Sequence, residues 1–286
     1  MTAARGGRST ISRIRVHYQS LPPSERKLAD LILDFPGDIA GYSATELAHL
    51  AGVSKAAATR LFQRLGYSSF EEARRAAREE RDWGSPLYLL SHPPELGNVD
   101  AKLKLHLERD LANMTRTFEA LESHKLKQIV DKLLEAKRLW LLGYRNSSSL
   151  AGLARWQFIQ IRDQVHMLHA GGETLAEQLA DLQPDDLVVI FGFRRRPAQL
   201  RSALKSIHAM GVPILYITEP AVGATVNYAT WLLQAEVSGT GTFDSYPAAM
   251  SLIHLLSVSM VDKAGKNGRM RLKQIEDLHD DLGDFH

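Results

Sequence analysis

Side chains able to bind anions gather in three short stretches of this sequence. Residues 54–64 read SKAAATRLFQR, residues 143–149 read GYRNSSS, and residues 191–197 read FGFRRRP. Basic and hydroxyl side chains, with the backbone N–H groups beside them, bind phosphate and carboxylate groups. The chain has no cysteine, so thiolate metal ligands, a cysteine nucleophile and disulfides are excluded. The chemistry that these stretches indicate is recognition of negatively charged partners.

The first stretch has the composition of a helix that reads DNA. At about 100° per residue, one side of this helix is apolar, and it consists of Ala58, Leu61, Phe62 and Leu65. The opposite side has no carboxylate, which suits contact with phosphates and with base edges in the major groove. The residues predicted to contact DNA are Ser54, Lys55, Ala56, Thr59, Arg60, Gln63 and Arg64. The alternative is a three-helix module with a solvated basic face.

Two helices predicted before this stretch would position it. The first has one apolar stripe at i, i+3, i+4 and i+7, which consists of Leu28, Leu31, Ile32 and Phe35. Pro36 ends it, and Ser43 with Glu46 has the spacing of a capping box at the start of the next helix. Gly52 suits the tight turn that follows, and Ser54 can cap the third helix. This order predicts a helix-turn-helix in an all-α N-terminal domain.

The other two stretches follow predicted strands. From residue 138 onward, short runs of branched and aromatic residues alternate with helical runs, which predicts an α/β sandwich whose parallel sheet is covered on both faces. The predicted strands are 138–142, 165–169, 187–193, 213–218 and 231–236. Ligands of open parallel sheets bind beyond the carboxyl ends of the strands. Because both stretches follow neighbouring βα units, we expect them at the same edge of the sheet.

The serine stretch has the features of an anion site. Ser147, Ser148 and Ser149 would lie at a helix N-terminus, where hydroxyls and free backbone N–H groups bind anions. Arg145 adds a positive charge beside them. The alternative is an ordinary N-cap, because serine is common there in any case.

The arginine run is more unusual. Arg194, Arg195 and Arg196 repel one another unless something anionic lies near them. We expect them to bind an anionic metabolite, either a sugar phosphate or a sugar acid, because arginine holds phosphate and carboxylate bidentately. A solvated loop, salt bridges to a partner subunit, and contact with the other domain or with DNA are the alternatives. Pro197 is expected to open the next helix.

Catalysis is not expected from these residues. Aldose–ketose isomerisation needs a general base beside the sugar, and the candidates are Glu173, Glu219, Asp244 and His254. Glu173 is better explained as a helix cap, and His254 as a core histidine among leucines. His166 and His169 fall on opposite faces of a strand, so we expect no metal site and no cofactor. A sugar-phosphate isomerase with an appended N-terminal module is the alternative function.

The length of 286 residues favours more than one domain. We predict a DNA-binding domain at 1–83, a linker rich in proline and glycine at 84–98, and an effector-binding and oligomerisation domain at 99–286. Residues 251–260 are apolar nearly all round, which favours a homodimer or homotetramer. The tryptophans read as core or interface residues are Trp140, Trp156 and Trp231. With no apolar signal segment and no long apolar run, we expect a cytoplasmic protein without a membrane partner.

Several of these residues together resemble a known family of regulators. The N-terminal motif residues are Ala48, Gly52, Val53, Ser54, Arg60, Leu65, Gly66, Tyr67 and Phe70. They resemble the N-terminal domain of the RpiR family of transcription regulators, and the second half resembles the sugar-isomerase (SIS) domain attached to it. The resemblance covers roughly residues 11–263. It implies a winged or extended helix-turn-helix, a SIS-like sandwich with a parallel five-stranded sheet, and assembly as dimers or tetramers.

The chain departs from the family's pattern at both predicted sites. Ala57 stands where the family usually has threonine in the recognition helix, so the operator is expected to differ. In the SIS pattern, Gly143, Ser147 and Ala151 match, but Arg145 replaces the second glycine. The serine, serine and threonine that usually bind the sugar phosphate are replaced, and their positions hold Phe191, Phe193 and Arg196. These replacements argue against isomerase activity.

Overall fold

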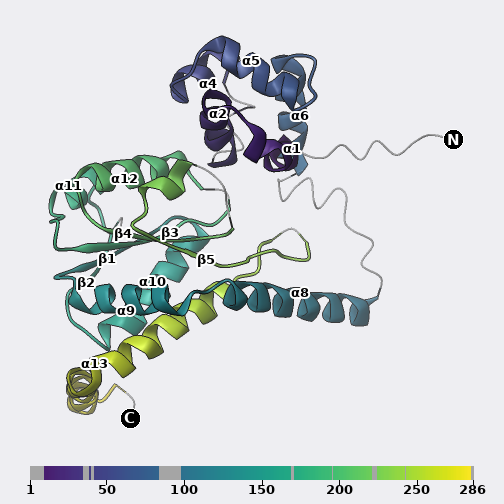
Figure 1. Cartoon of the computed structure of the whole chain (residues 1–286). Coiled ribbons are helices and arrows are strands. Elements are labelled where there is room, and N and C mark those ends of the chain that lie inside the picture. The colour runs from purple at the N-terminus through teal and green to yellow at the C-terminus, as the bar shows by residue number, and fades with distance from the viewer. Residues whose placement is uncertain are drawn as a thin grey trace. The chain divides into compact units, whose positions relative to one another are not determined.

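The computed structural model describes residues 10–34, 39, 42–83, 98–168, 171–194, 196–220, 224–241 and 243–284. The chain forms two compact units, a helical one and one built around a sheet. Figure 1 shows the helical unit in purple and blue and the sheet unit in teal to yellow. Each unit has its own buried core. Of the predicted linker, only Asn98 lies within the described residues.

The helical unit is built from short amphipathic helices. They are α1 (Thr10–His17), the 3-10 turn η1 (Tyr18–Ser20), α2 (Pro23–Asp34), α4 (Ala44–Leu50), α5 (Lys55–Arg64) and α6 (Phe70–Trp83). The predicted apolar face of α5 is buried as expected, and so are Leu28, Leu31 and Ile32 on α2. Phe35 lies outside the described residues. The 3.6-residue periodicity therefore predicted correctly which sides of these two helices form the core.

Helices α4 and α5 form the predicted helix-turn-helix. Ser43 Oγ accepts a hydrogen bond from the Glu46 N–H at 3.2 Å, and Glu46 Oε2 accepts one from the Ser43 N–H at 2.7 Å. Gly52 in the turn has φ +64°, a conformation that glycine adopts without strain. Ser54 Oγ accepts from the Ala57 N–H at 3.2 Å. The capping box, the turn and the cap are all confirmed.

The second unit contains the five predicted strands; β1 is shifted by one residue, and the other four are one or two residues shorter than expected. They are β1 (Leu139–Gly143), β2 (Val165–Met167), β3 (Leu187–Phe191), β4 (Ile214–Thr218) and β5 (Trp231–Gln234). All neighbouring pairs are parallel, in the order β2-β1-β3-β4-β5. The predicted α/β sandwich with a parallel five-stranded sheet is confirmed.

Helices cover both faces of this sheet. After residue 98 the chain forms the helical elements α8 (Val99–Glu119), α9 (Ser123–Glu135), α10 (Asn146–Ile159), α11 (Leu175–Ala180), α12 (Ala198–Ala209), the 3-10 turn η2 (Ala224–Tyr228) and α13 (Pro247–Leu282), of which α9 to α13 cover the sheet. In Figure 1, α9, α10 and α13 lie below the sheet, and α11 and α12 lie above it. Alternate strand residues such as Leu141 and Val189 enter the core on the α9, α10 and α13 side. None of the described helices combines the length and the apolar character that crossing a membrane requires.

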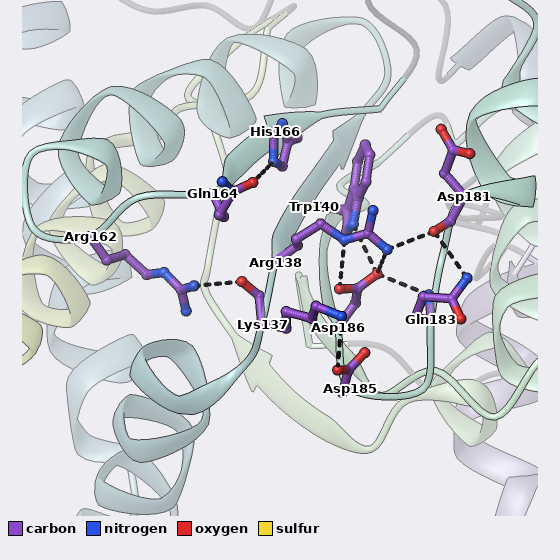
Figure 2. Close-up of polar contacts among 10 residues, drawn as sticks. All are labelled: Lys137, Arg138, Trp140, Arg162, Gln164, His166, Asp181, Gln183, Asp185 and Asp186. Atoms are coloured by element: carbon purple, nitrogen blue, oxygen red, sulfur yellow. Dashed lines mark hydrogen bonds and ion pairs between the residues drawn. The ribbon is translucent and has the colours of Figure 1, made fainter.

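A polar network ties together the amino ends of β1 and β3 (Figure 2). Asp186 accepts hydrogen bonds from Arg138 Nε at 2.9 Å and Nη2 at 2.8 Å. It accepts two more, from Trp140 Nε1 at 3.2 Å and from the Gln183 N–H at 2.9 Å. Burial raises the pKa of Asp186, but these hydrogen bonds and the charge of Arg138 outweigh it and hold the pKa below its ordinary value. Asp186 is therefore a structural carboxylate.

The side chain of Arg162 caps the C-terminal end of α9. Its Nη1 donates to the carbonyl oxygens of Leu133, Leu134 and Ala136, and its Nη2 donates to that of Lys137. The last carbonyl groups of a helix have no partner within the helix, so a guanidinium at this position satisfies several of them at once.

Candidate functional site

The predicted DNA-binding residues all lie on the exposed side of the helix-turn-helix. Ser54, at the N-cap of α5, is exposed, and so are the helix residues Lys55, Ala56, Thr59, Arg60, Gln63 and Arg64. Thr59 Oγ1 donates to the carbonyl oxygen of Lys55 at 3.2 Å. The departure at Ala57 is on the other side, because its side chain is buried. A hydroxyl at this position would therefore not lie on the outer face of α5 in this conformation.

One carboxylate beneath this face was missed by the sequence reasoning. Arg64 Nε donates to Glu25 Oε2 on α2 at 2.9 Å, and Arg60 Nε lies 3.6 Å from Glu25 Oε1. The exposed face itself carries no acid, as predicted, but two of its arginines form ion pairs with the buried Glu25 of α2. Glu25 precedes Arg64 by 39 residues, and no helical spacing connects positions so far apart.

The second candidate site lies at the carboxyl edge of the sheet, where the strand order reverses. The chain passes from β1 outward to β2 and returns to β3 on the other side of β1. In folds of this order, the crevice between the ends of β1 and β3 is the usual ligand position. Gly143 and Phe191 are register partners at these two ends, and Ser147 Oγ accepts from the Phe193 N–H at 3.4 Å. The serine stretch and the arginine run thus meet at one edge.

The turn between β1 and α10 is tightly constrained. A Cβ atom on Gly143 would lie 2.1 Å from the carbonyl oxygen of Ser147, so only glycine fits there. Arg145 has φ +57° and ψ −128°, a conformation that belongs almost exclusively to glycine in tight turns. The SIS pattern's second glycine is therefore replaced by arginine at a position whose backbone conformation strongly favours glycine. Ser147 is buried, and Ser148 and Ser149 are exposed beside Arg145.

The arginine run has partners inside the chain. Arg194 Nε lies 3.5 Å from Asp244 Oδ1. The side chain of Arg196 is only 5% exposed and is paired with Glu219; it also donates to the carbonyl oxygen of Gly192 at 2.8 Å. Arg195 lies outside the described residues. The expectation of three cations offered to a ligand is therefore revised, because Arg196 is held in an internal ion pair.

The candidate bases for isomerisation are in different surroundings. Burial raises the pKa of Glu219 above its ordinary value, although the charge of Arg196 opposes this shift. The prediction for Glu173 was wrong, because Thr174 caps α11 with Glu177 as its capping-box partner. The prediction for His254 was also wrong, since its side chain is exposed. Trp156 is exposed as well, so it is not a core residue.

Potential metal ligands do not gather in the described part of the chain: no group of three or more His, Asp or Glu side chains there is placed to hold an ion. His169 lies outside that part. The site at the sheet edge is thus composed of hydroxyls, backbone N–H groups, guanidinium groups and the two carboxylates Glu219 and Asp244.

Two family models match the chain, one for each part. The model described as a helix-turn-helix domain of the rpiR family matches residues 9–81, and the model described as a SIS domain matches residues 132–259. The fold and these matches define a helix-turn-helix transcription regulator with an attached SIS domain. The chain thus combines the helix-turn-helix domain of the rpiR family with a SIS domain, the combination that its motifs predicted.

Similar known proteins align with most of the chain or with its second part. The HTH-type transcriptional regulator YfhH of Escherichia coli (strain K12) is 26% identical over 282 residues, covering 93% of this chain and 96% of YfhH. The Vibrio vulnificus NanR protein, solved in complex with ManNAc-6P, is 18% identical, with a TM-score of 0.60 over 95% of this chain and 98% of NanR. The sugar isomerase domain of an RpiR transcription factor from Sphaerobacter thermophilus is 21% identical, with a TM-score of 0.57 over 60% and 97% of the two chains. The two structures support the fold.

Proposed function

We propose that this regulator reads its operator with α5 and that an anionic metabolite at the carboxyl edge of the sheet controls that binding. The observation that carries the proposal is the outer face of α5, which presents Lys55, Arg60, Gln63 and Arg64 to solvent with no exposed carboxylate among them. Arginine and glutamine are the side chains that form bidentate contacts with guanine and adenine. A solvated basic face needs no such mixture of hydrogen-bonding side chains.

We expect Arg60→Ala to weaken binding to a selected operator by about 1–3 kcal/mol, because one base-edge contact is lost. The operator is obtained by selection from a random DNA pool with the wild-type protein, and affinities are measured by fluorescence anisotropy. Lys55→Ala should instead lower the slope of log K against log salt by about one, as expected for one phosphate contact. Unchanged affinity and slope in both folded variants would contradict the recognition-helix assignment.

The effector site is proposed at the β1–α10 turn. Ser148, Ser149 and Arg145 are exposed at the N-terminus of a 14-residue helix, where backbone N–H groups and the helix dipole favour an anion. Arg194, half-exposed on the neighbouring loop, can add a second cation. NanR, which shares the fold, was solved in complex with ManNAc-6P, and this supports a sugar phosphate or sugar acid as the ligand here.

Arg145→Gly tests this site through two opposite effects. Glycine relieves the strained backbone, so the free protein should gain about 1 kcal/mol in stability. The same change removes a cation, so the rise in melting temperature with hexose phosphates or aldonic acids should shrink. Neutral hexoses are the control ligands, and Lys205→Ala, an exposed charge on α12, is the control variant. A variant that keeps the full response would place the ligand elsewhere.

Self-association is proposed through the second unit. In α8, residues 99–112 include no buried side chain, and a helical segment this short is barely stable alone in water. Its exposed aliphatic residues repeat every fourth position and are Val99, Leu103, Leu107 and Leu111. Figure 1 shows α8 running away from the sheet. On α13, Leu252, Ile253, Leu256 and Met260 are buried and Met250 and Val258 are exposed, which adds a second apolar surface.

Leu107→Lys should dissociate the oligomer, because a lysine would replace an apolar contact on both copies of a two-fold interface. Sedimentation velocity at micromolar concentration measures the outcome. Ala101→Lys adds the same charge to an exposed position on another side of α8 and should leave the assembly intact. A wild-type monomer at this concentration would refute the proposal.

An SIS-type isomerase is the second candidate function. Glu219, half-buried beside Arg196, is the residue that favours it, since a raised pKa suits a general base. Against it, Phe191, Phe193 and Arg196 replace the hydroxyl residues of the SIS pattern, and the relatives are named as transcription regulators. We propose that the protein is not an enzyme; conversion of an aldose phosphate by the purified protein, followed by NMR, would overturn this.

A further inference from the structure

The carboxylate behind the recognition helix is far less exposed than the arginines it contacts. The side chain of Glu25 is 2% exposed, whereas those of Arg60 and Arg64 are 57% and 43% exposed. A buried carboxylate is costly unless cations and hydrogen bonds compensate it. Glu25 also lies in the first turn of α2, where the helix dipole favours a negative charge. The position of the Glu25 carboxylate is therefore set by α2, and the longer side chains of Arg60 and Arg64 extend from α5 to reach it.

The contacts restrict each arginine at a point partway along its side chain. The shortest contact of both residues with Glu25 is made by Nε, and the terminal Nη fork lies beyond that atom. A free arginine loses considerable rotamer freedom when it binds. An arginine held at Nε has already lost part of that freedom, while its fork is still available for a bidentate contact with a base or a phosphate.

The same carboxylate changes the charge of the face. Non-specific attraction to DNA grows with the number of phosphates neutralised by cations. A negative charge behind Arg60 and Arg64 lowers this general attraction without removing their hydrogen-bond donors. Specificity depends on the difference in free energy between binding to the operator and binding to random DNA.

We infer that Glu25 is a positioning residue for DNA recognition, which holds Arg60 and Arg64 in place for base contacts and reduces their non-specific attraction to phosphate. The inference rests on the proposed role of α5. The competing explanation is that Glu25 only fastens α2 to α5 and has no effect on how the arginines meet DNA.

The test compares Glu25→Gln with Glu71→Gln in the full-length protein. Both remove one negative charge from the helical unit, but Glu71 is exposed and pairs only with its neighbour on α6, Arg74, at 3.3 Å among the described residues. For Glu25→Gln we expect the ratio of operator to random-DNA affinity to fall on the order of tenfold, and the salt slope to steepen by about one. Glu71→Gln should leave the ratio unchanged. In an Arg64→Ala background, the effect of Glu25→Gln should shrink, because one of its two targets is gone.

A folded Glu25→Gln variant with the wild-type ratio would overturn the inference, as would an undiminished effect in the Arg64→Ala background. If Arg60→Ala leaves operator binding unchanged, the assignment of α5 itself fails, which is a separate result. Relaxation of the arginine Nε–H signals by NMR gives a reading independent of DNA. We expect the Arg64 signal to be ordered in the wild type and mobile in Glu25→Gln; equal mobility in both would refute positioning.

Discussion

Replacing Arg138 with alanine is expected to lower the free energy of unfolding of the sheet unit by about 3–5 kcal/mol. The Asp186 side chain is 0% exposed, and Arg138 supplies two of its hydrogen bonds and its counter-charge. Without the guanidinium, a buried carboxylate is left without a cation. Urea unfolding followed by tryptophan fluorescence measures the loss, and Trp140 reports locally because it donates to Asp186.

The neighbouring residue offers a matched control. Lys137 and Asp185 form an ion pair at 3.6 Å in which both side chains are more than half exposed. Exposed pairs contribute at most about 1 kcal/mol, so Lys137→Ala should change stability little. Similar losses in Arg138→Ala and Lys137→Ala would contradict the structural role given to the network in Figure 2.

The pH dependence of this pair follows from the lowered pKa of Asp186. A carboxyl whose folded-state pKa lies below its unfolded value stabilises the fold above the unfolded pKa, and this stabilisation is lost as pH falls through the folded pKa. In Arg138→Ala, burial is the main remaining influence on Asp186 and should raise the pKa of its carboxyl. The free energy of unfolding of the variant should therefore fall less in acid than that of the wild type. The difference in stability between wild type and variant should therefore narrow below about pH 4.

Alanine at Gly143 is expected to cost about 3 kcal/mol or more, because its Cβ would overlap backbone atoms of Ser147. The clash is with backbone, so the first turn of α10 must move, and the candidate effector site moves with it. The melting temperature of Gly143→Ala should fall, and the rise in melting temperature that hexose phosphates cause should shrink.

Gly152 provides the control on the same helix. A Cβ there would meet nothing within 4 Å, and alanine inside a helix is favoured over glycine by about 0.5–1 kcal/mol. Gly152→Ala should therefore stabilise the protein while Gly143→Ala destabilises it. Equal effects of the two substitutions would show that the close approach at Gly143 does not exist in solution.

The sequence by itself determined the local features of this protein. The buried side of α5, the capping box at Ser43 and the five strands were predictable, because the periods of helices and strands place side chains on faces whatever the rest of the chain does. The meeting of the Ser147 turn with the arginine loop was also predictable, since neighbouring parallel strands bring their carboxyl ends to one edge.

Only the tertiary structure decided how charges are paired. Glu25 pairs with Arg64, which lies 39 residues later in the sequence, and Arg196 pairs with Glu219, which lies 23 residues later. These ion pairs depend on how the helices pack and on which loops lie side by side. His254 is exposed although leucine and isoleucine surround it in sequence, because the helix turns its position outward by about 100° from each neighbour. Sequence spacing records position within one element, whereas an ion pair between elements depends on packing that no local period encodes.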